Sequence, residues 1–162
     1  MTSLENAPVI DGVIDGLLGN EIEVSNLKVV RNYDPALPPL ITDANQLQQV
    51  ILNIVNNARD AIGSNPGEIV IATSRRGSRM VVSIRDNGGG MTPEVLEKLF
   101  VPFFTTKEVG RGTGLGLSVS YGIVRNLGGE IEVESIAGEG STFKLVLPIK
   151  SKRTLDRSEK NQ

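Results

Sequence analysis

The sequence contains no cysteine, no histidine and no tryptophan, and each absence excludes a class of chemistry. Without cysteine there is no disulfide framework and no thiolate metal site, which favours a cytoplasmic protein. Without histidine the chain lacks the commonest general base, the commonest zinc ligand and any phosphoacceptor imidazole of its own. No apolar run approaches the length of a membrane span, and the first residues lack the pattern of a signal peptide.

The composition is that of an ordinary globular domain. The chain has 162 residues, of which 39% are hydrophobic and 22% charged, so one core of useful size can form. A net charge of −2 gives no electrostatic reason to expect nucleic acid or an anionic membrane as partner. We expect a leader and first helix at 1–19, a folded domain at 20–149 and a flexible tail at 150–162.

Hydrophobic periodicity, glycines and prolines divide the chain into alternating helices and strands. The order predicts an α+β fold, a two-layer α/β sandwich with a mixed sheet of about five strands and three main helices on one face. We expect helices at 6–19, 43–62, 92–99 and 113–126, and strands at 26–33, 68–74, 80–85, 129–136 and 141–149.

Alternating glycines in the segment 110–118 stand directly before the last predicted helix. Backbone without side chains can wrap around a phosphate, and a helix N-terminus attracts an anion. No strand precedes the glycines and no lysine follows the last one, so neither a dinucleotide-binding nor a Walker context surrounds them. A plain glycine-rich turn is the alternative.

The long predicted helix carries polar residues along the border of its apolar face. Asn53, Asn57 and Asp60 lie side by side there, whereas Arg59 points away and is expected to be exposed. Amide and carboxylate oxygens suit a magnesium ion that keeps several waters and takes its other ligands from phosphates; a solvated flank is the alternative. The apolar arc consists of Leu47, Val50, Ile51, Ile54, Val55, Ala58, Ala61 and Ile62.

Two loops add candidate binding groups. Asp86 ends a strand and precedes the glycines of 88–90, so its carboxylate can accept the exocyclic amine of adenine; a simple strand-exit turn is the alternative. Phe100, Phe103 and Phe104 adjoin the segment 105–107, which indicates a hinged lid or a small satellite core. The only cations of this loop are Lys107 and Arg111, which either neutralise phosphate or are plain surface charges.

The order and spacing of these motifs are more specific than any one of them. The segments 53–58, 86–91, 100–107 and 112–117 resemble the asparagine, first glycine, phenylalanine and second glycine boxes of sensor histidine kinases. The segment 140–143 resembles the closing motif of the same catalytic ATP-binding domain. The resemblance covers roughly 40–148 and implies the ATP-binding sandwich, with a mobile ATP lid, that type II topoisomerases, mismatch-repair ATPases and certain chaperones share.

The resemblance implies roles for individual residues. Asn57 would be the Mg²⁺ ligand, with Asn53 beside it toward the phosphates, and Asp86 would hold the adenine amine, helped through water by Thr142. It implies catalytic roles for Asn53, Asn57 and Lys107. The implied nucleotide-binding residues are Asn53, Asn57, Asp60, Asp86, Gly88, Gly90, Met91, Phe104, Thr105, Thr106, Lys107, Arg111, Gly112, Thr113, Gly114, Leu115, Gly116, Leu117 and Thr142.

Two positions depart from relatives of this superfamily. Asp60 stands where many of these kinases carry a lysine toward the phosphates. Asn53 stands where the hydrolytic relatives carry a glutamate that activates water. A neutral amide cannot take a proton from water, which favours phosphoryl transfer over rapid hydrolysis.

The activity implied by the resemblance is that of a histidine protein kinase. It would transfer the γ-phosphoryl group of ATP, with Mg²⁺, to a histidine on a separate dimerisation and phosphoacceptor domain, because this chain has no histidine. The implied partners are those helices of the parent protein and a response regulator receiver domain. A free-standing serine kinase and anti-sigma factor of the same fold, or a non-catalytic nucleotide-sensing module, are the alternatives.

Overall fold

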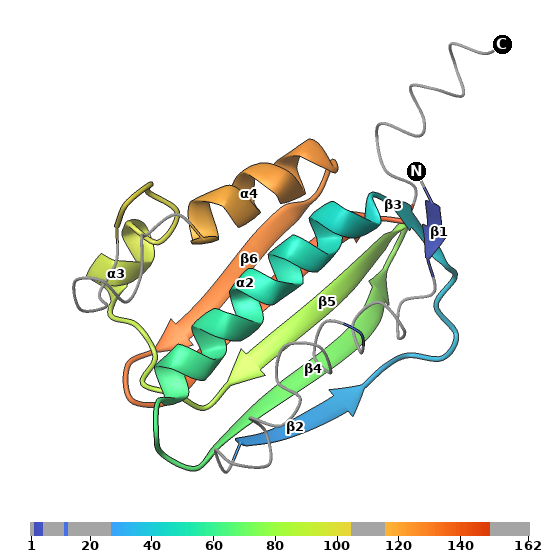
Figure 1. Ribbon diagram of the computed structural model, residues 1–162. Coiled ribbons are helices and arrows are strands. Elements are labelled where there is room, and N and C mark those ends of the chain that lie inside the picture. Colours follow the sequence, from blue (N-terminus) through green and yellow to red (C-terminus); the bar gives the residue numbers. More distant parts are fainter. Residues whose placement is uncertain (1, 5–11, 13–26, 105–115, 150–162) are drawn as a thin grey trace, which may run out of the picture.

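A mixed five-stranded sheet forms the larger layer of the fold (Figure 1). The computed structural model describes residues 2–4, 12, 27–104 and 116–149. The strand order is β2-β4-β5-β7-β6, with β2 and β4 parallel and all other neighbours antiparallel. The strands are β2 (Leu27–Asn32), β4 (Gly67–Arg76), β5 (Arg79–Asp86), β6 (Glu130–Ile136) and β7 (Gly140–Pro148).

Helices cover one face of this sheet (Figure 1). The long helix α2 (Ala44–Ile62) packs on β4, β5 and β7, and α4 (Gly116–Asn126) packs on α2 and β6. A short helix, α3 (Pro93–Glu97), follows the loop after β5. The predicted α+β sandwich is confirmed, whereas the predicted helix at 6–19 (residue 12 apart), the moving part of the lid at 105–111 and the tail at 150–162 lie outside the described residues. None of the helices in the described part is long and apolar enough to cross a membrane.

Local signals in the sequence set both ends of α2. The Asp43 side chain caps the helix by accepting a hydrogen bond from the Gln46 N–H at 3.2 Å. The helix ends at Gly63, which has a φ of 66° and donates its N–H to the Arg59 carbonyl at 3.0 Å. Because the crossover between the parallel strands β2 and β4 runs through α2, the helix is held across the sheet.

A second, two-stranded sheet was not predicted. It pairs β1 (Thr2–Leu4) with β3 (Leu40–Thr42) in antiparallel register. The Ile41 N–H donates to the Ile149 carbonyl at 2.8 Å, so β3 is also tied to the chain just beyond β7. These strands of three residues are too short to show a periodic pattern.

The core lies between α2, α4 and the inner face of the sheet. Seven of the eight residues of the predicted apolar arc of α2 are buried, but Ala61 is exposed. In the last turn of α2, Ile62 stays in the core and lies close to Gly67 of β4, whereas Ala61 adjoins the loop after β5. Arg59 is half-buried, so the prediction that it is exposed was wrong; the stem of a long side chain at the border of an apolar face can pack along that face.

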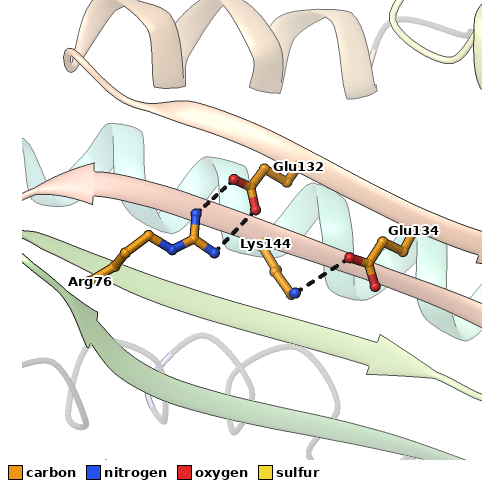
Figure 2. A network of polar contacts seen from close by, with 4 residues as sticks. All are labelled: Arg76, Glu132, Glu134 and Lys144. Atoms are coloured by element: carbon orange, nitrogen blue, oxygen red, sulfur yellow. Dashed lines mark hydrogen bonds and ion pairs between the residues drawn. The ribbon is translucent and has the colours of Figure 1, made fainter.

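The outer face of the sheet carries charged pairs (Figure 2). Arg76 contacts Glu132 at 2.7 Å and Lys144 contacts Glu134 at 3.6 Å. The guanidinium of Arg76 lowers the pKa of Glu132, mainly by donating hydrogen bonds to its carboxylate. Exposed pairs of this kind contribute little to the stability of the fold. The face of the sheet that carries these charges is the one that the helices leave uncovered.

Candidate functional site

β5 ends, directly before a glycine loop, with the most unusual titratable group in the described part of the fold. Asp86 is only 2% exposed although it is a carboxylate at a strand end. Burial raises its pKa, while the backbone N–H groups of Gly88 and Ser141 act in the opposite direction. The Gly88 N–H donates to one carboxylate oxygen at 2.9 Å, which leaves the carboxylate with further acceptor capacity for a ligand.

Glycine is required in this loop because backbone from two directions comes close to it. A Cβ at Gly88 would lie 2.6 Å from the carbonyl carbon of Ala61, in the last turn of α2. The Gly89 N–H donates to the Ala61 carbonyl at 3.2 Å. Gly90 has a φ of 66°, and a Cβ there would overlap the Ile136 carbonyl oxygen at the end of β6. The loop is therefore held between the end of α2 and the turn that joins β6 to β7.

Thr142 does not lie where the resemblance placed it. In the antiparallel register Asp86 is paired with Ser141, and Thr142 is paired with Arg85. Directly paired residues share a face of the sheet and successive residues alternate, so Thr142 lies on the face opposite Asp86. Ser141, which is 6% exposed, occupies the position beside Asp86.

Polar residues on the flank of α2 face the beginning of α4. The Asn53 amide nitrogen donates to the Gly116 carbonyl at 3.1 Å and to the Ser120 hydroxyl at 3.0 Å. Its oxygen accepts a hydrogen bond from the Gln49 side chain at 2.9 Å. The structure thus brings together Asn53 and Gly116, two predicted site residues that are 63 positions apart in the sequence.

The oxygen groups on this flank of α2 suit a metal ion that keeps several water ligands better than one that is coordinated by protein side chains alone. Asn57 follows Asn53 by one turn and is half-buried, and Asp60 is exposed. Within the described residues, no group of three or more carboxylate, histidine or cysteine side chains could hold a metal. Mg²⁺ commonly takes one or two protein oxygens and obtains the rest from phosphates and water, so these residues fit such an ion.

The aromatic residues near the predicted lid have unequal environments. Phe100 is half-buried and its ring centroid lies 5.1 Å from that of Tyr121 on α4. Phe103 has a φ of 66° and is 73% exposed, whereas Phe104 is half-buried. Leu117 packs against the main core. The predicted site residues that fall outside the described part of the chain are Thr105, Thr106, Lys107, Arg111, Gly112, Thr113, Gly114 and Leu115.

Three serines take part in the site although no role was assigned to any of them from the sequence. Ser120 is fully buried between α2 and α4, where its hydroxyl also donates to the Gly116 carbonyl at 2.8 Å. The Ser135 hydroxyl on β6 accepts from the Met91 N–H at 2.8 Å. Ser141 completes the set beside Asp86. Serine occurs throughout the chain, so only the strand register and the helix packing distinguish these positions.

Comparison with known proteins agrees with this geometry. Residues 42–151 match the protein family described as histidine kinase-, DNA gyrase B-, and HSP90-like ATPase. Sensor kinase CckA of Brucella abortus is 41% identical over 157 residues, which cover 86% of this chain and 16% of that protein. Two-component sensor PprA of Pseudomonas aeruginosa is 46% identical over 140 residues, which cover 83% of this chain and 15% of that protein.

Similar solved structures cover nearly the whole chain. The nucleotide-free catalytic domain of histidine kinase ThkA superposes with a TM-score of 0.82 at 31% identity, covering 92% of this chain and 95% of that domain. Histidine kinase ThkA in complex with the response regulator protein TrrA gives a TM-score of 0.78 at 28% identity, covering 92% of this chain and 42% of that one. The chain thus spans one whole domain of the solved relative but only about one sixth of the two curated sensors.

Proposed function

The chain belongs to the histidine kinase-, DNA gyrase B- and HSP90-like ATPase family as a catalytic domain of the sensor histidine kinase type, and from that premise we propose how it works. It binds ATP with the base at Asp86 and the phosphates between α2 and the beginning of α4. It then transfers the γ-phosphoryl group, in the cytoplasm, to a histidine on separate phosphoacceptor helices of a parent kinase. The burial of Asp86 beside a glycine loop is the observation that carries this proposal.

Base recognition follows from the chemistry of Asp86. A carboxylate accepts but does not donate, so it matches the exocyclic amine of adenine and repels the carbonyl oxygen that guanine carries at the equivalent position. One of its oxygens takes the Gly88 N–H, which fixes the orientation of the group. Ser141, in the role first assigned to Thr142, lies beside it on the same face of the sheet.

We place the phosphates at the beginning of α4, on the other side of the site from Asp86. The first N–H groups of α4 have no partner within the helix, and the helix dipole attracts an anion there. The hydrogen bond from Asn53 to Gly116 fixes this helix end beside the flank of α2. Asn57 would hold Mg²⁺ there, and the ion would neutralise phosphate charge when bound. Lys107 and Arg111 are the cations that we assign to the phosphates from the lid.

The environment of Asn53 favours transfer over hydrolysis. Its nitrogen donates to two acceptors and its oxygen accepts from Gln49, so this neutral side chain is not available as a base for water. The nucleophile is then an imidazole nitrogen of another domain, which forms the new P–N bond as the bond to the leaving ADP breaks. The partners of the chain are accordingly its phosphoacceptor helices and, downstream, a response regulator receiver domain.

The proposal is tested by transfer of label from [γ-³²P]ATP. The full chain is mixed with the histidine-bearing helices of its parent kinase and with a variant of those helices in which the histidine is glutamine. We expect label on the first helices only, stable in alkali and lost in acid, as a phosphoramidate is. Acid-stable label on a serine of a partner protein would contradict the proposal, and so would ATP binding that never leads to transfer.

A further inference from the structure

The turn between β6 and β7 is joined to the loop after β5 by several contacts that the base-binding proposal does not use. The Gly138 N–H donates to the Gly89 carbonyl at 2.7 Å. The Gly90 backbone packs against the Ile136 carbonyl, and Gly140, with a φ of 126°, packs against the Asp86 carbonyl. At each of the two glycines there is no room for a Cβ. The loop and the turn therefore form one closely packed unit around Asp86.

One side chain connects the polar groups of this unit. The Ser135 hydroxyl accepts the Met91 N–H at 2.8 Å, lies 2.8 Å from the Ser141 hydroxyl and lies 3.1 Å from the Gly140 carbonyl. Ser135 is paired with Ser141 across β6 and β7, and Ser141 is paired with Asp86 across β7 and β5. The three side chains thus form a row across the inner face of three strands.

We infer that Ser135 is a positioning residue for adenine recognition, an inference that rests on the proposed function. By accepting the Met91 N–H it holds the end of the glycine loop against β6, and through its hydroxyl pair it orients Ser141 beside Asp86. Ser135 does not contact the base itself. Its effect is on how sharply the site distinguishes an amine from a carbonyl, because that distinction depends on the placement of Asp86 and its neighbours.

Loss of the Ser135 hydroxyl removes the partner of three groups: the Met91 N–H, the Ser141 hydroxyl and the Gly140 carbonyl. The Met91 N–H loses its acceptor and the Ser141 hydroxyl loses its neighbour, so the loop gains freedom at the base end of the site only. The phosphate end, at Asn53 and α4, lies on other elements. A defect confined to base selection is therefore the signature of this role, whereas a general loss of stability would weaken all nucleotides alike.

The test compares ATP and GTP affinity, by calorimetry on the full chain with Mg²⁺, for the wild type, Ser135→Ala, Ser135→Thr and the control Ser83→Ala. Ser83 is a strand serine on the outer face of β5, where it is paired with Lys144. We expect Ser135→Ala to weaken ATP binding about tenfold and to weaken GTP binding less, so that the preference for ATP falls. Ser135→Thr, which keeps the hydroxyl, should restore the preference for ATP. Ser83→Ala should have the same affinity for both nucleotides as the wild type.

Other outcomes are equally informative. If Ser135→Ala keeps the preference for ATP over GTP, because its affinity falls equally for both nucleotides or for neither, the inference is overturned while the proposed function stays intact. Absence of ATP binding by the wild type would instead contradict the proposed function. If Ser135→Ala lacks the circular dichroism spectrum of the wild type, Ser135→Cys, whose thiol is somewhat larger than the hydroxyl and forms a much weaker hydrogen bond, is judged by the same criterion.

Discussion

Replacing Asp86 by asparagine should weaken ATP binding and stabilise the empty fold at the same time. The two side chains have nearly the same shape, and the asparagine oxygen can still accept the Gly88 N–H, now 2.9 Å from the carboxylate. What changes is the charge, which is buried with only 2% of the residue exposed. A single variant therefore separates the functional value of that charge from its effect on folding.

The loss of affinity can be estimated from one hydrogen bond. A bond between a charged acceptor and a neutral donor contributes about 1.5–3 kcal/mol, which corresponds to roughly a 10- to 150-fold change in Kd. We expect isothermal titration with ATP and Mg²⁺ to show a loss in this range for Asp86→Asn. Asp34→Asn, a change of the same kind in the connection after β2, serves as the control and should leave the affinity unaltered.

The effect on stability follows from the raised pKa of Asp86. Because its pKa in the folded protein lies above the ordinary value of 3.8, the folded state holds the proton more tightly than the unfolded state. The ionised carboxylate thus destabilises the fold at a pH above its folded pKa, and this effect disappears as the pH falls toward 3.8. Asp86→Asn should raise the melting temperature at pH 8 and raise it less at pH 4.5.

Two results would refute this reasoning. ATP affinity equal to that of the wild type would remove Asp86 from the base site. A melting temperature at pH 8 that falls in Asp86→Asn would show that the carboxylate is stabilised by its hydrogen bonds more than burial destabilises it, which is the reverse of the raised pKa.

Three further changes test the surroundings of the site. Gly88→Ala should destabilise the fold by about 1–3 kcal/mol, because its Cβ overlaps the backbone of the last turn of α2; chemical denaturation measures this, and unchanged stability would mean that the loop does not pack there. Asn53→Ala should speed hydrogen exchange in the first turn of α4, because the bond to Gly116 is lost, and equal protection would argue against that contact. Arg76→Ala should leave both the melting temperature and ATP affinity unaltered, since its pair with Glu132 is exposed, and a loss of ATP affinity would show that the outer face takes part in binding.

The sequence was sufficient to predict the fold class and the larger helices and strands. The apolar face of α2, its cap at Asp43 and its stop at Gly63 are local signals, and the structure places the helix at Ala44–Ile62 between them. The hairpins were predicted because glycine turns separate alternating strands. β4, β5 and β7 extend one or two residues further toward their turns than predicted, whereas β6 ends where it was predicted to end. The strands β1 and β3 could not be predicted, since their partners lie about 38 residues apart and three residues carry no period.

Site residues were predictable where a sequence motif identifies them. They were less predictable where the pairing of strands decides which residue faces the site. Asp86 and Asn53 were assigned from their motifs, and they lie on the elements that the motifs imply. Thr142 and Ser141 are neighbours in one motif, and only the pairing of β5 with β7 shows which of them faces Asp86. Ala61 was misassigned because helical angles place it at the edge of the apolar arc, and in the structure it is exposed although Ala58 and Ile62 on the same arc are buried.

The central claim, that one nucleotide joins the Asp86 loop to the beginning of α4, is tested most directly by amide chemical shifts. The ¹⁵N-labelled chain is titrated with ATP in the presence of Mg²⁺, and the shifts of its backbone amides are followed. We predict that Gly88 and Met91 at the base end and Leu117 at the phosphate end shift together at one affinity, while residues of the outer face such as Glu132 do not. Shifts confined to the outer face, or separate affinities for the two ends, would contradict a single ATP site.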